Sequence, residues 1–492
     1  MQKRKTVGMQ QKQLARLCAV AFGAAGFGVV GIASAQSTGG GNFLERKPGD
    51  GFTLVTRGGE ISVYGMLDLS IDDTTKGLGR VTLDGASPPV GNTGWMVAIS
   101  SNLSYVGVRG FQALSEATRF AYQLETQIDV SNTPGTQNTN SNTSDQVKGA
   151  LVSRNSFIGV QDAIGAVKIG KTDAPYKAST ARMNPFSGMI GDYQVIMGNT
   201  GGDNRVEFGT RLSHAVWYES PDWAGFRFNA LISPGQNRAN DSSNVPSGDP
   251  DCAGGNIPGS GGLPVACNDG SYSNAYSTNL SYEVGGLYVT AAYELHKKVN
   301  RTSDLPTFNP LDVADEDAGK VALQYKLGTG TTVSAIYEKL RRRIDASLAD
   351  QNERQRTGYW LAASQQIGSA DSVHVGWAHA NRAQGELGQH NPDPTKADAN
   401  GFFPGADNSA NLYTAAWKHQ IDRNFNWYFT YATTLNARFA HYDLGAGGRS
   451  VTTDCHDAAN PDTSGFDPNG GAPHCYTGAH LQGVSIGMHY TF

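Results

Sequence analysis

The last thirteen residues, 480–492, alternate between apolar and small or polar side chains and end on phenylalanine. The apolar set is Val484, Ile486, Met488, Tyr490 and Phe492. Successive side chains of a β-strand leave on opposite faces, so this set shares one face. An exposed edge strand of this kind would invite aggregation in water, whereas a strand with lipid on one side and water on the other requires the pattern. The ending predicts the closing strand of a transmembrane β-barrel.

The first 35 residues have the features of an export signal. Five basic residues precede or open an apolar run over 17–32, and Ala33-Ser34-Ala35 is a small-residue cleavage site. An anchoring helix is disfavoured because the run is only sixteen residues long and is rich in Gly and Ala. We expect residues 1–35 to be a cleaved signal peptide and Gln36 to begin the mature chain.

Charge and hydropathy exclude two classes of protein. Loss of residues 1–35 removes five basic and no acidic side chains from totals of 39 and 44, which leaves 34 Lys and Arg against 44 Asp and Glu. This acidic balance argues against a nucleic-acid partner, which needs a basic face. Beyond the signal, no run of eighteen apolar residues occurs, so helical membrane spans are not expected.

Alternating segments recur from Glu60 onward and are joined by short and long connections in turn. The long ones are polar and rich in Gly, Asn, Asp and Pro, and fall at 74–99, 131–149, 172–208, 235–274, 300–316, 344–354, 381–408 and 436–478. The short ones fall at 113–116, 162–165, 220–224, 285–286, 328–330, 368–370 and 422–424. Eight long and seven short connections predict a sixteen-stranded antiparallel barrel with short periplasmic turns, long extracellular loops and both ends in the periplasm.

The phase of several strands supports a barrel over a soluble β-sandwich. In the strand after Asp422, four aromatic residues fall on one face, at positions 425, 427, 429 and 431. A sandwich turns its polar face outward and does not need aromatic residues at four successive outward positions. Elsewhere the opposite faces carry charges, which are costly in lipid and suit a wet barrel wall.

Four cysteines remain after the signal and form two local pairs, Cys252 with Cys267 and Cys455 with Cys475. An even count behind a signal peptide predicts disulfides in an oxidising compartment, and local pairing is favoured over the two other connectivities because each pair lies within one loop. Cys455-His456 and His474-Cys475 could instead form a Cys2His2 metal site. A disulfide with incidental histidines is the preferred interpretation, so no metal and no cofactor are predicted.

Two enzyme motifs occur in contexts that do not suit them. Residues 165–172 fit the P-loop pattern GxxxxGK[ST], but 166–169 reads as the strand itself, and Pro175 stands where the P-loop helix would run. Residues 483–487 fit the GxSxG nucleophile elbow, but only five residues follow Ser485 and none is acidic. Ser485 is instead expected on the inner wall, and the chain is not expected to be an enzyme.

With these features in place, the chain resembles the general, non-specific, trimeric porins of Gram-negative outer membranes over essentially all of residues 60–492. The stretches that carry the resemblance are short and occur in the family's order: VYGMLD at 63–68, SYVGVRG at 104–110, YQLE at 122–125, RNSFIG at 154–159, Gly170-Lys171, NPF at 184–186, GTR at 209–211, YESP at 218–221, Gly225-Phe226 and the terminal strand. Residues 36–59 have no counterpart in it and form an N-terminal extension of unclear role.

The resemblance implies a constriction with charges of opposite sign. In that family the third loop folds into the lumen and its acids face basic residues of the wall. The matching basic residues here are Arg109, Arg154, Lys171 and Arg211, and the matching acids of the loop are Asp192, Asp203 and Glu207. Tyr105 departs from the family, which usually has arginine there, and an aromatic ring could offer sugars a stacking surface. Phe492 is implied to belong to the outer-membrane assembly signal.

The expected function is passive diffusion of small hydrophilic solutes and ions through a water-filled barrel in the outer membrane. The resemblance also implies a homotrimer in contact with outer-membrane lipid and lipopolysaccharide. Two alternatives stay open: a substrate-selective channel of the same fold, and an outer-membrane barrel hydrolase. The hydrolase would need a nucleophile, a base and an orienting group near one rim, and the sequence offers no such set.

Overall fold

The computed structural model describes residues 52–75, 95–128, 130–131, 154–198, 208–234, 272–300, 313–343, 355–382, 407, 409–437, 440, 442, 444–445 and 480–492. The chain divides into two units, Met1–Gly40 and Gly41–Phe492, and all described residues belong to the second. Helices among them are too short and too polar to cross a membrane. The four cysteines of the expected disulfides lie outside the described residues.

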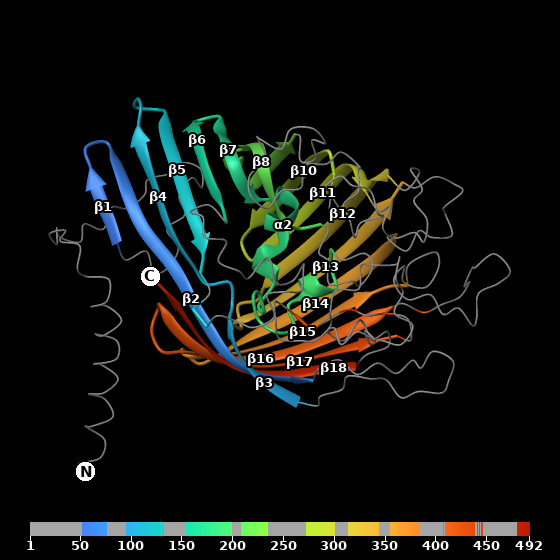
Figure 1. Ribbon diagram of the computed structural model, residues 1–492. Helices are drawn as coiled ribbons and strands as arrows, with labels where there is room; N and C mark the ends of the chain where they lie inside the picture. Colours follow the sequence, from blue (N-terminus) through green and yellow to red (C-terminus); the bar gives the residue numbers. More distant parts are fainter. Residues whose placement is uncertain are drawn as a thin grey trace, which may run out of the picture. The chain divides into compact units, whose positions relative to one another are not determined.

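Antiparallel strands make up most of the described chain (Figure 1). They are β1 (Phe52–Thr56), β2 (Gly59–Thr75), β3 (Trp95–Ser101), β4 (Tyr105–Ala113), β5 (Arg119–Gln127), β6 (Ser156–Asp162), β7 (Gly165–Asp173), β8 (Arg211–Glu219), β9 (Phe226–Ser233), β10 (Asn274–Val284), β11 (Leu287–Asn300), β12 (Val313–Lys326), β13 (Thr331–Arg342), β14 (Arg356–Ile367), β15 (Asp371–Ala380), β16 (Ala410–Gln420), β17 (Phe425–Asn436) and β18 (His480–Thr491).

Sixteen strand positions close into a barrel, as the count of connections predicted. Each strand from β4 to β18 pairs with the next, and β18 pairs with β2, which closes the ring. β3 and β4 form one position because both pair with β2, along 69–75 and 59–66 respectively. The break between them lies at 102–104, where Leu103 has a positive φ of 58°. The side-chain amide of Asn102 fastens the break by donating to Asp68 at 2.9 Å and to the Tyr428 hydroxyl at 2.8 Å.

β1 is an additional strand that the sequence did not predict. It pairs with β2 from Phe52↔Val63 to Thr56↔Gly59, along the edge of β2 that β18 occupies further on. The C-terminus ends just before it, since Phe492 and Gly65 exchange two backbone hydrogen bonds of 3.0 and 3.1 Å. Part of the N-terminal extension of 36–59 is therefore a strand.

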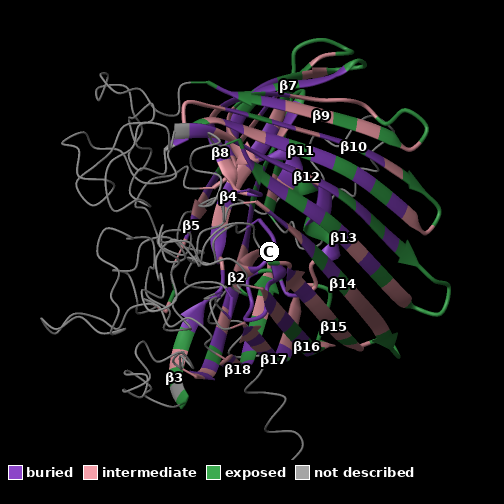
Figure 2. Cartoon of the chain, turned by 90° about the vertical axis from the view of Figure 1, so that its right-hand side faces the viewer, coloured by how far each residue is buried: buried purple, intermediate pink, exposed green. Residues whose placement is uncertain are grey.

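The outward and inward faces follow the predicted alternation. Figure 2 shows buried and exposed residues in stripes along β9 to β17. In β18, Ile486 and Met488 are 58% and 55% exposed, whereas Ser485 is 2% exposed. In β17, Phe429 and Tyr431 are exposed and Tyr428 is buried. The exposed apolar side chains form the surface that faces lipid in a transmembrane barrel.

The connection between β7 and β8, residues 174–210 and hereafter loop 3, holds the helical segments. They are α2 (Pro175–Thr180), η2 (Ala181–Met183) and η3 (Tyr193–Val195), and Figure 1 shows α2 within the curve of the strands. The expectation that Pro175 opposes a helix was wrong, because proline is tolerated in the first turn, where it stands. The P-loop interpretation still fails, since Gly165–Asp173 is a strand and no glycine loop precedes the helix.

Candidate functional site

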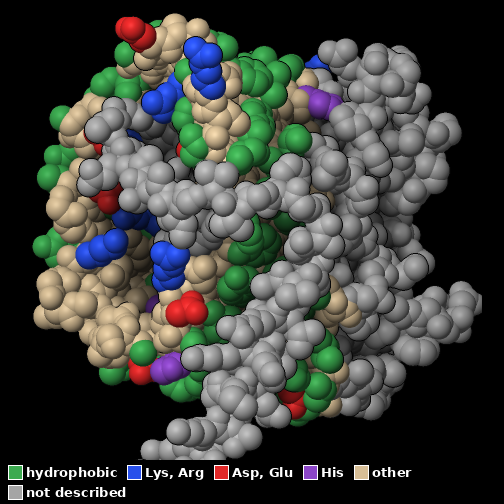
Figure 3. Space-filling view, turned by 90° about the vertical axis from the view of Figure 1, so that its left-hand side faces the viewer, with side chains coloured by type: hydrophobic (Ala, Val, Ile, Leu, Met, Phe, Trp, Pro, Cys, Tyr) green, Lys and Arg blue, Asp and Glu red, His purple; other side chains and the backbone are tan. Residues whose placement is uncertain are grey.

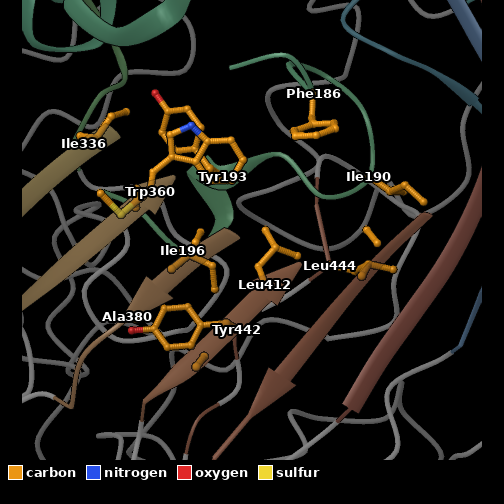
Figure 4. Packing of buried hydrophobic residues seen from close by; sticks show 14 of the residues in the cluster. Phe186, Ile190, Tyr193, Ile196, Ile336, Trp360, Ala380, Leu412, Tyr442 and Leu444 are labelled. Atoms are coloured by element: carbon orange, nitrogen blue, oxygen red, sulfur yellow. The ribbon is translucent and has the colours of Figure 1, made fainter. Parts of the chain in front are cut away.

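Loop 3 lies against the inner wall of the later strands through an apolar cluster (Figure 4). Phe186 packs edge-on to Trp360 of β14 with ring centroids 6.0 Å apart, and Tyr193 lies 5.1 Å from the same indole. Other members are Ile190, Ile196 and Met197 from the loop, with Ile336, Leu412, Ala416, Ala432 and Leu481 from the wall. Burial of this surface stabilises one position of the loop, at roughly 25 cal/mol per Å² of apolar area.

Polar contacts fix both ends of loop 3 to the same wall. Glu338 of β13 accepts a hydrogen bond from the Tyr176 hydroxyl and another from the backbone N–H of Gly198, each at 2.7 Å. Further along the wall, the indole N–H of Trp360 donates to the Met183 carbonyl at 3.0 Å, and Lys418 donates to the Pro185 carbonyl at 2.6 Å. Charged side chains of this wall, Glu338 and Lys418 among them, therefore help to hold the loop.

A second connection also contacts loop 3. The backbone N–H of Gly191 donates to the carbonyl of Leu444 at 2.8 Å, and Ile190 forms a β-bridge with Gly445. Ala440, Tyr442 and Leu444 belong to the same apolar cluster as Phe186 and Trp360. The start of the β17–β18 connection is thus packed on loop 3, a contact that the sequence did not predict.

The early strands carry a different inner wall, with arginine stacked on tyrosine. The Arg109 guanidinium lies 4.6 Å from the ring centroid of Tyr64, and that of Arg154 lies 4.6 Å from the ring of Tyr105. The two tyrosine rings meet edge to face at 6.0 Å. Glu125 of β5 links them, since it accepts from Tyr64 at 3.0 Å and pairs with Arg154 at 2.5 Å.

Next to this stack, Asp173 at the end of β7 holds two more cations. Its carboxylate lies 3.1 Å from Arg211 and 3.0 Å from Lys177 of α2. Asn155 aligns the group, because it donates to Asp173 at 3.1 Å and accepts from Arg211 at 2.7 Å. We call Arg109, Arg154, Lys177 and Arg211 the arginine cluster. With Glu125 and Asp173 it contains four cations and two carboxylates.

Three predicted basic residues, Arg109, Arg154 and Arg211, are thus brought together on one wall. Lys171 is placed differently. In the register of β6 and β7 it lies opposite Ser156, and alternation puts it on the same face as Val167 and Ile169, which are exposed outward. A register irregularity between Gly170 and Thr172 lies at the same point. The role of Lys171 as a pore cation stays a prediction.

Of the predicted acids of loop 3, Asp192 lies among the described residues, and its contacts are mainly within the loop. Asp192 caps η3 and accepts from the backbone N–H of Gln194 at 3.0 Å, from Gly188 at 3.1 Å and from the Asn184 amide at 2.7 Å. Burial raises the pKa of the Asp192 carboxyl, and these hydrogen bonds act in the opposite direction. Asp203 and Glu207 lie outside the described residues.

The acids that do meet the arginines come from the wall, and the sequence analysis did not assign them. Alternation along β5 places Glu125 on the inner wall, so the sequence could have indicated this partner. The sequence offered no such indication for Asp173, because Asp173 fell inside a predicted loop. Figure 3 shows Lys and Arg side chains, with some Asp and Glu, around a hollow on the left of that face. An inner wall of paired charges suits a path for water and hydrophilic solutes.

The fold and the charged lumen agree with a comparison of the sequence with family models. A model described as Gram-negative porin matches residues 19–438 of the 492. The chain belongs to the Gram-negative porins. This porin is therefore an outer-membrane, multi-pass β-barrel that forms a channel for passive diffusion of small hydrophilic solutes and ions. No curated protein sequence matches it significantly.

Solved structures of low sequence identity share the fold of this porin. An anion-selective porin from Comamonas acidovorans has a TM-score of 0.55 at 15% identity, with 88% of this chain and 100% of that chain covered. Salmonella typhi OmpF in complex with daunomycin has a TM-score of 0.50 at 13% identity, with 90% and 100% covered. At such identities the likeness shows the fold alone.

Proposed function

We propose that this porin passes small hydrophilic solutes along the arginine cluster, with a modest preference for anions. The observation that carries the proposal is the gathering of cations in the cluster, where Arg154, Lys177 and Arg211 pair with Glu125 and Asp173, and Arg109 lies over the Tyr64 ring. Fixed charges at a narrow point attract ions of opposite sign and repel ions of like sign. Because Glu125 and Asp173 compensate part of the positive charge, we expect a weaker preference than the cations alone would produce.

A bilayer measurement tests this proposal. The purified protein is inserted into a planar bilayer under a KCl gradient, and the reversal potential is read in dilute and in concentrated salt. We expect an anion-preferring reversal potential that shrinks as salt rises, because the Debye length falls from about 10 Å at 0.1 M to about 3 Å at 1 M. A cation preference in dilute salt would refute the selectivity, and the absence of conductance would refute the open path.

Tyr105 is proposed to position Arg154 rather than to bind sugars. Tyr105 is 8% exposed, and the Arg154 guanidinium lies over one face of its ring, so little stacking surface remains. Cation–π contact of this kind is worth about 0.5–2 kcal/mol. Absence of single-channel block by sugars would agree with this role.

The remaining expectations are proposals that rest on the sequence and on the family. They are cleavage of residues 1–35, local disulfides Cys252–Cys267 and Cys455–Cys475, a homotrimer, an assembly role of Phe492, and no enzymatic activity. Mass spectrometry of the mature protein, with and without reduction, checks the first two. Light scattering in detergent checks the third, and surface levels of a chain lacking Phe492 check the fourth. Hydrolysis assays on lipid and peptide substrates check the last.

A further inference from the structure

The first residues of the β17–β18 connection lie inside the barrel. We call the described ones the inner arm: Ala437, Ala440, Tyr442, Leu444 and Gly445. Tyr442 and Leu444 are buried in the apolar cluster of the later strands (Figure 4). The inner face of β18 lies against the arm, because a Cβ on Gly483 would come within 2.9 Å of the Leu444 side chain. Gly483 shares this face with Ser485, since the two are two residues apart on the strand.

The inner arm lies at the end of the barrel that carries the long connections. Its apolar cluster includes Ala380, the last residue of β15, and Ala410, the first residue of β16, which lie opposite each other. Asn436, the last residue of β17, lies on the other side of Ala410. A solute that enters the barrel at this end therefore passes the arm, and the width open to the solute there is reduced by it.

Asn436 holds the arm where the chain leaves β17. Its side-chain N–H donates to the Tyr442 carbonyl, and its side-chain oxygen accepts from the Tyr442 N–H, both at 2.8 Å. The backbone N–H of Ala437 donates to the Ser409 carbonyl at 2.9 Å. Buried backbone N–H and C=O groups need hydrogen-bond partners, and one asparagine provides both partners for Tyr442 within an otherwise apolar cluster. Asn436 therefore fixes the direction of the chain into the lumen.

Loop 3 holds the other end of the arm. The Gly191 N–H donates to the Leu444 carbonyl at 2.8 Å, and the Gly191 carbonyl accepts from the hydroxyl of Thr414 on β16, also at 2.8 Å. Gly445 forms the β-bridge with Ile190, and a Cβ on Gly445 would lie 2.8 Å from the Gly191 nitrogen and 2.9 Å from the Ile190 Cα. The arm and loop 3 thus lie side by side on the inner wall, too close for a side chain at residue 445.

We propose that the inner arm is a second size-limiting element of the channel, in addition to loop 3, and that Asn436 is the residue that positions it. A segment inside the barrel occupies cross-section that water and solutes would otherwise use, and the diameter of a pore is one determinant of which solutes pass. The described residues of the arm carry no charge. The arm therefore acts on the size of the solute, whereas the arginine cluster acts on its charge.

The test releases the arm of the full chain in two independent ways. Asn436→Ala removes both hydrogen bonds to Tyr442, and Gly445→Val puts a side chain where the backbone of loop 3 lies. The matched controls are Asn426→Ala, on the inner face at the other end of β17, and Gly319→Val, where nothing lies within 4 Å of the added Cβ. Swelling of liposomes that contain each protein is measured in neutral mono- and disaccharides. The ratio of the disaccharide rate to the monosaccharide rate reports the size limit.

We expect this ratio to rise roughly twofold or more in both arm variants, because each lost hydrogen bond favours the released arm by about twofold to tenfold. Both controls should keep the ratio of the parent. Asn436→Asp retains an acceptor for the Tyr442 N–H and loses the donor, so its ratio should lie between those of the parent and Asn436→Ala. The reversal potential in dilute KCl should stay at the parent value in Asn436→Ala and Gly445→Val, since neither changes a charge.

Three outcomes overturn the proposal: an unchanged ratio in the arm variants, an equal rise in the controls, or a lower ratio, which would mean that the released arm blocks the lumen. Greater current noise with an unchanged ratio also overturns it and makes the arm only a support for loop 3. Gel mobility of unheated samples shows which variants contain a folded barrel. Either arm variant decides the question if the other does not fold, because the two break different contacts. The reversal potential of the parent tests the anion preference separately.

Discussion

The two halves of the barrel lumen are built by the same alternation of strand residues, but their inward side chains have different roles. On the side of β2 to β8, arginine, tyrosine and carboxylate groups line the wall and pair with one another. On the side of β11 to β18, an apolar cluster and inward polar groups such as Glu338 hold loop 3. An inward position in a barrel is therefore not by itself a pore-lining position, and the solute path is expected to run along the charged half.

Removal of the Trp360 ring should have the largest effect, because it leaves a cavity under loop 3. Trp→Ala in a packed core costs about 3–5 kcal/mol, and Trp360 is fully buried between Phe186 and Tyr193. We expect Trp360→Ala to lower the temperature at which the barrel unfolds in detergent and to raise current noise. Thermal unfolding and single-channel recordings measure the two effects. Tyr359→Ala, which removes an outward ring from the neighbouring position, is the control and should leave the noise unchanged.

Loss of the Glu338 carboxylate should have the next largest effect. In Glu338→Gln the side-chain amide has only one acceptor oxygen, so it cannot replace both carboxylate oxygens, which accept from the Tyr176 hydroxyl and the Gly198 N–H. Hydrogen bonds to charged groups contribute about 1.5–3 kcal/mol each. We expect loop 3 to become accessible to proteases at 174–198 in the variant while the barrel stays folded. Equal protease resistance of parent and variant would show that the apolar cluster alone holds the loop.

On the charged half, Glu125→Gln should change selectivity and little else. The change removes the carboxylate that pairs with Arg154, so the net positive charge of the arginine cluster rises. We expect a larger anion preference, seen as a shift of the reversal potential in dilute salt that is lost in concentrated salt. Arg154→Gln should shift it in the opposite direction. Shifts of the same sign in both variants would mean that this pair does not lie on the ion path.

Lys171→Gln should give the smallest effect, because the register puts Lys171 on the face of Ile169. A reversal potential within error of the parent value in dilute salt is the expected result. A shift as large as that of Arg154→Gln would show that the irregularity after Gly170 turns Lys171 inward, and would restore it to the basic wall.

The sequence was sufficient for the features that depend on strand periodicity. Alternation placed Ile486 and Met488 outward and Ser485 inward, and the connections gave sixteen strand positions. It did not reveal which charges pair, because the partners are on strands far apart in sequence, as with Tyr64 and Glu125. Irregular backbone was missed for a similar reason: the break at Leu103 depends on tertiary contacts and not on a local turn signal.

The inner half under loop 3 was the part that the sequence described least well. Asp192 was expected at the constriction, which stays a prediction, and nothing in the sequence indicated that its oxygens accept from the backbone of its own loop. From the sequence alone, a loop carboxylate that lines the pore cannot be distinguished from one that accepts hydrogen bonds from nearby backbone N–H groups. The sequence also offered no sign that apolar residues of the inner wall, such as Leu412 and Trp360, would be covered by loop 3.

The edge of β2 that receives both ends of the chain has a practical consequence for how this protein can be altered. Phe492 forms backbone hydrogen bonds with Gly65, and β1 pairs with the same edge of β2 over residues 59–63. β1 thus limits how far β18 can pair along β2. A shift of the β18 register toward β1 would require β1 to dissociate from β2. A peptide tag added after Phe492 would compete with β1 for residues 59–63. We expect such tags to slow barrel closure, measured by the heat-dependent gel shift of folding samples, and tags on a chain lacking residues 52–56 to slow it less.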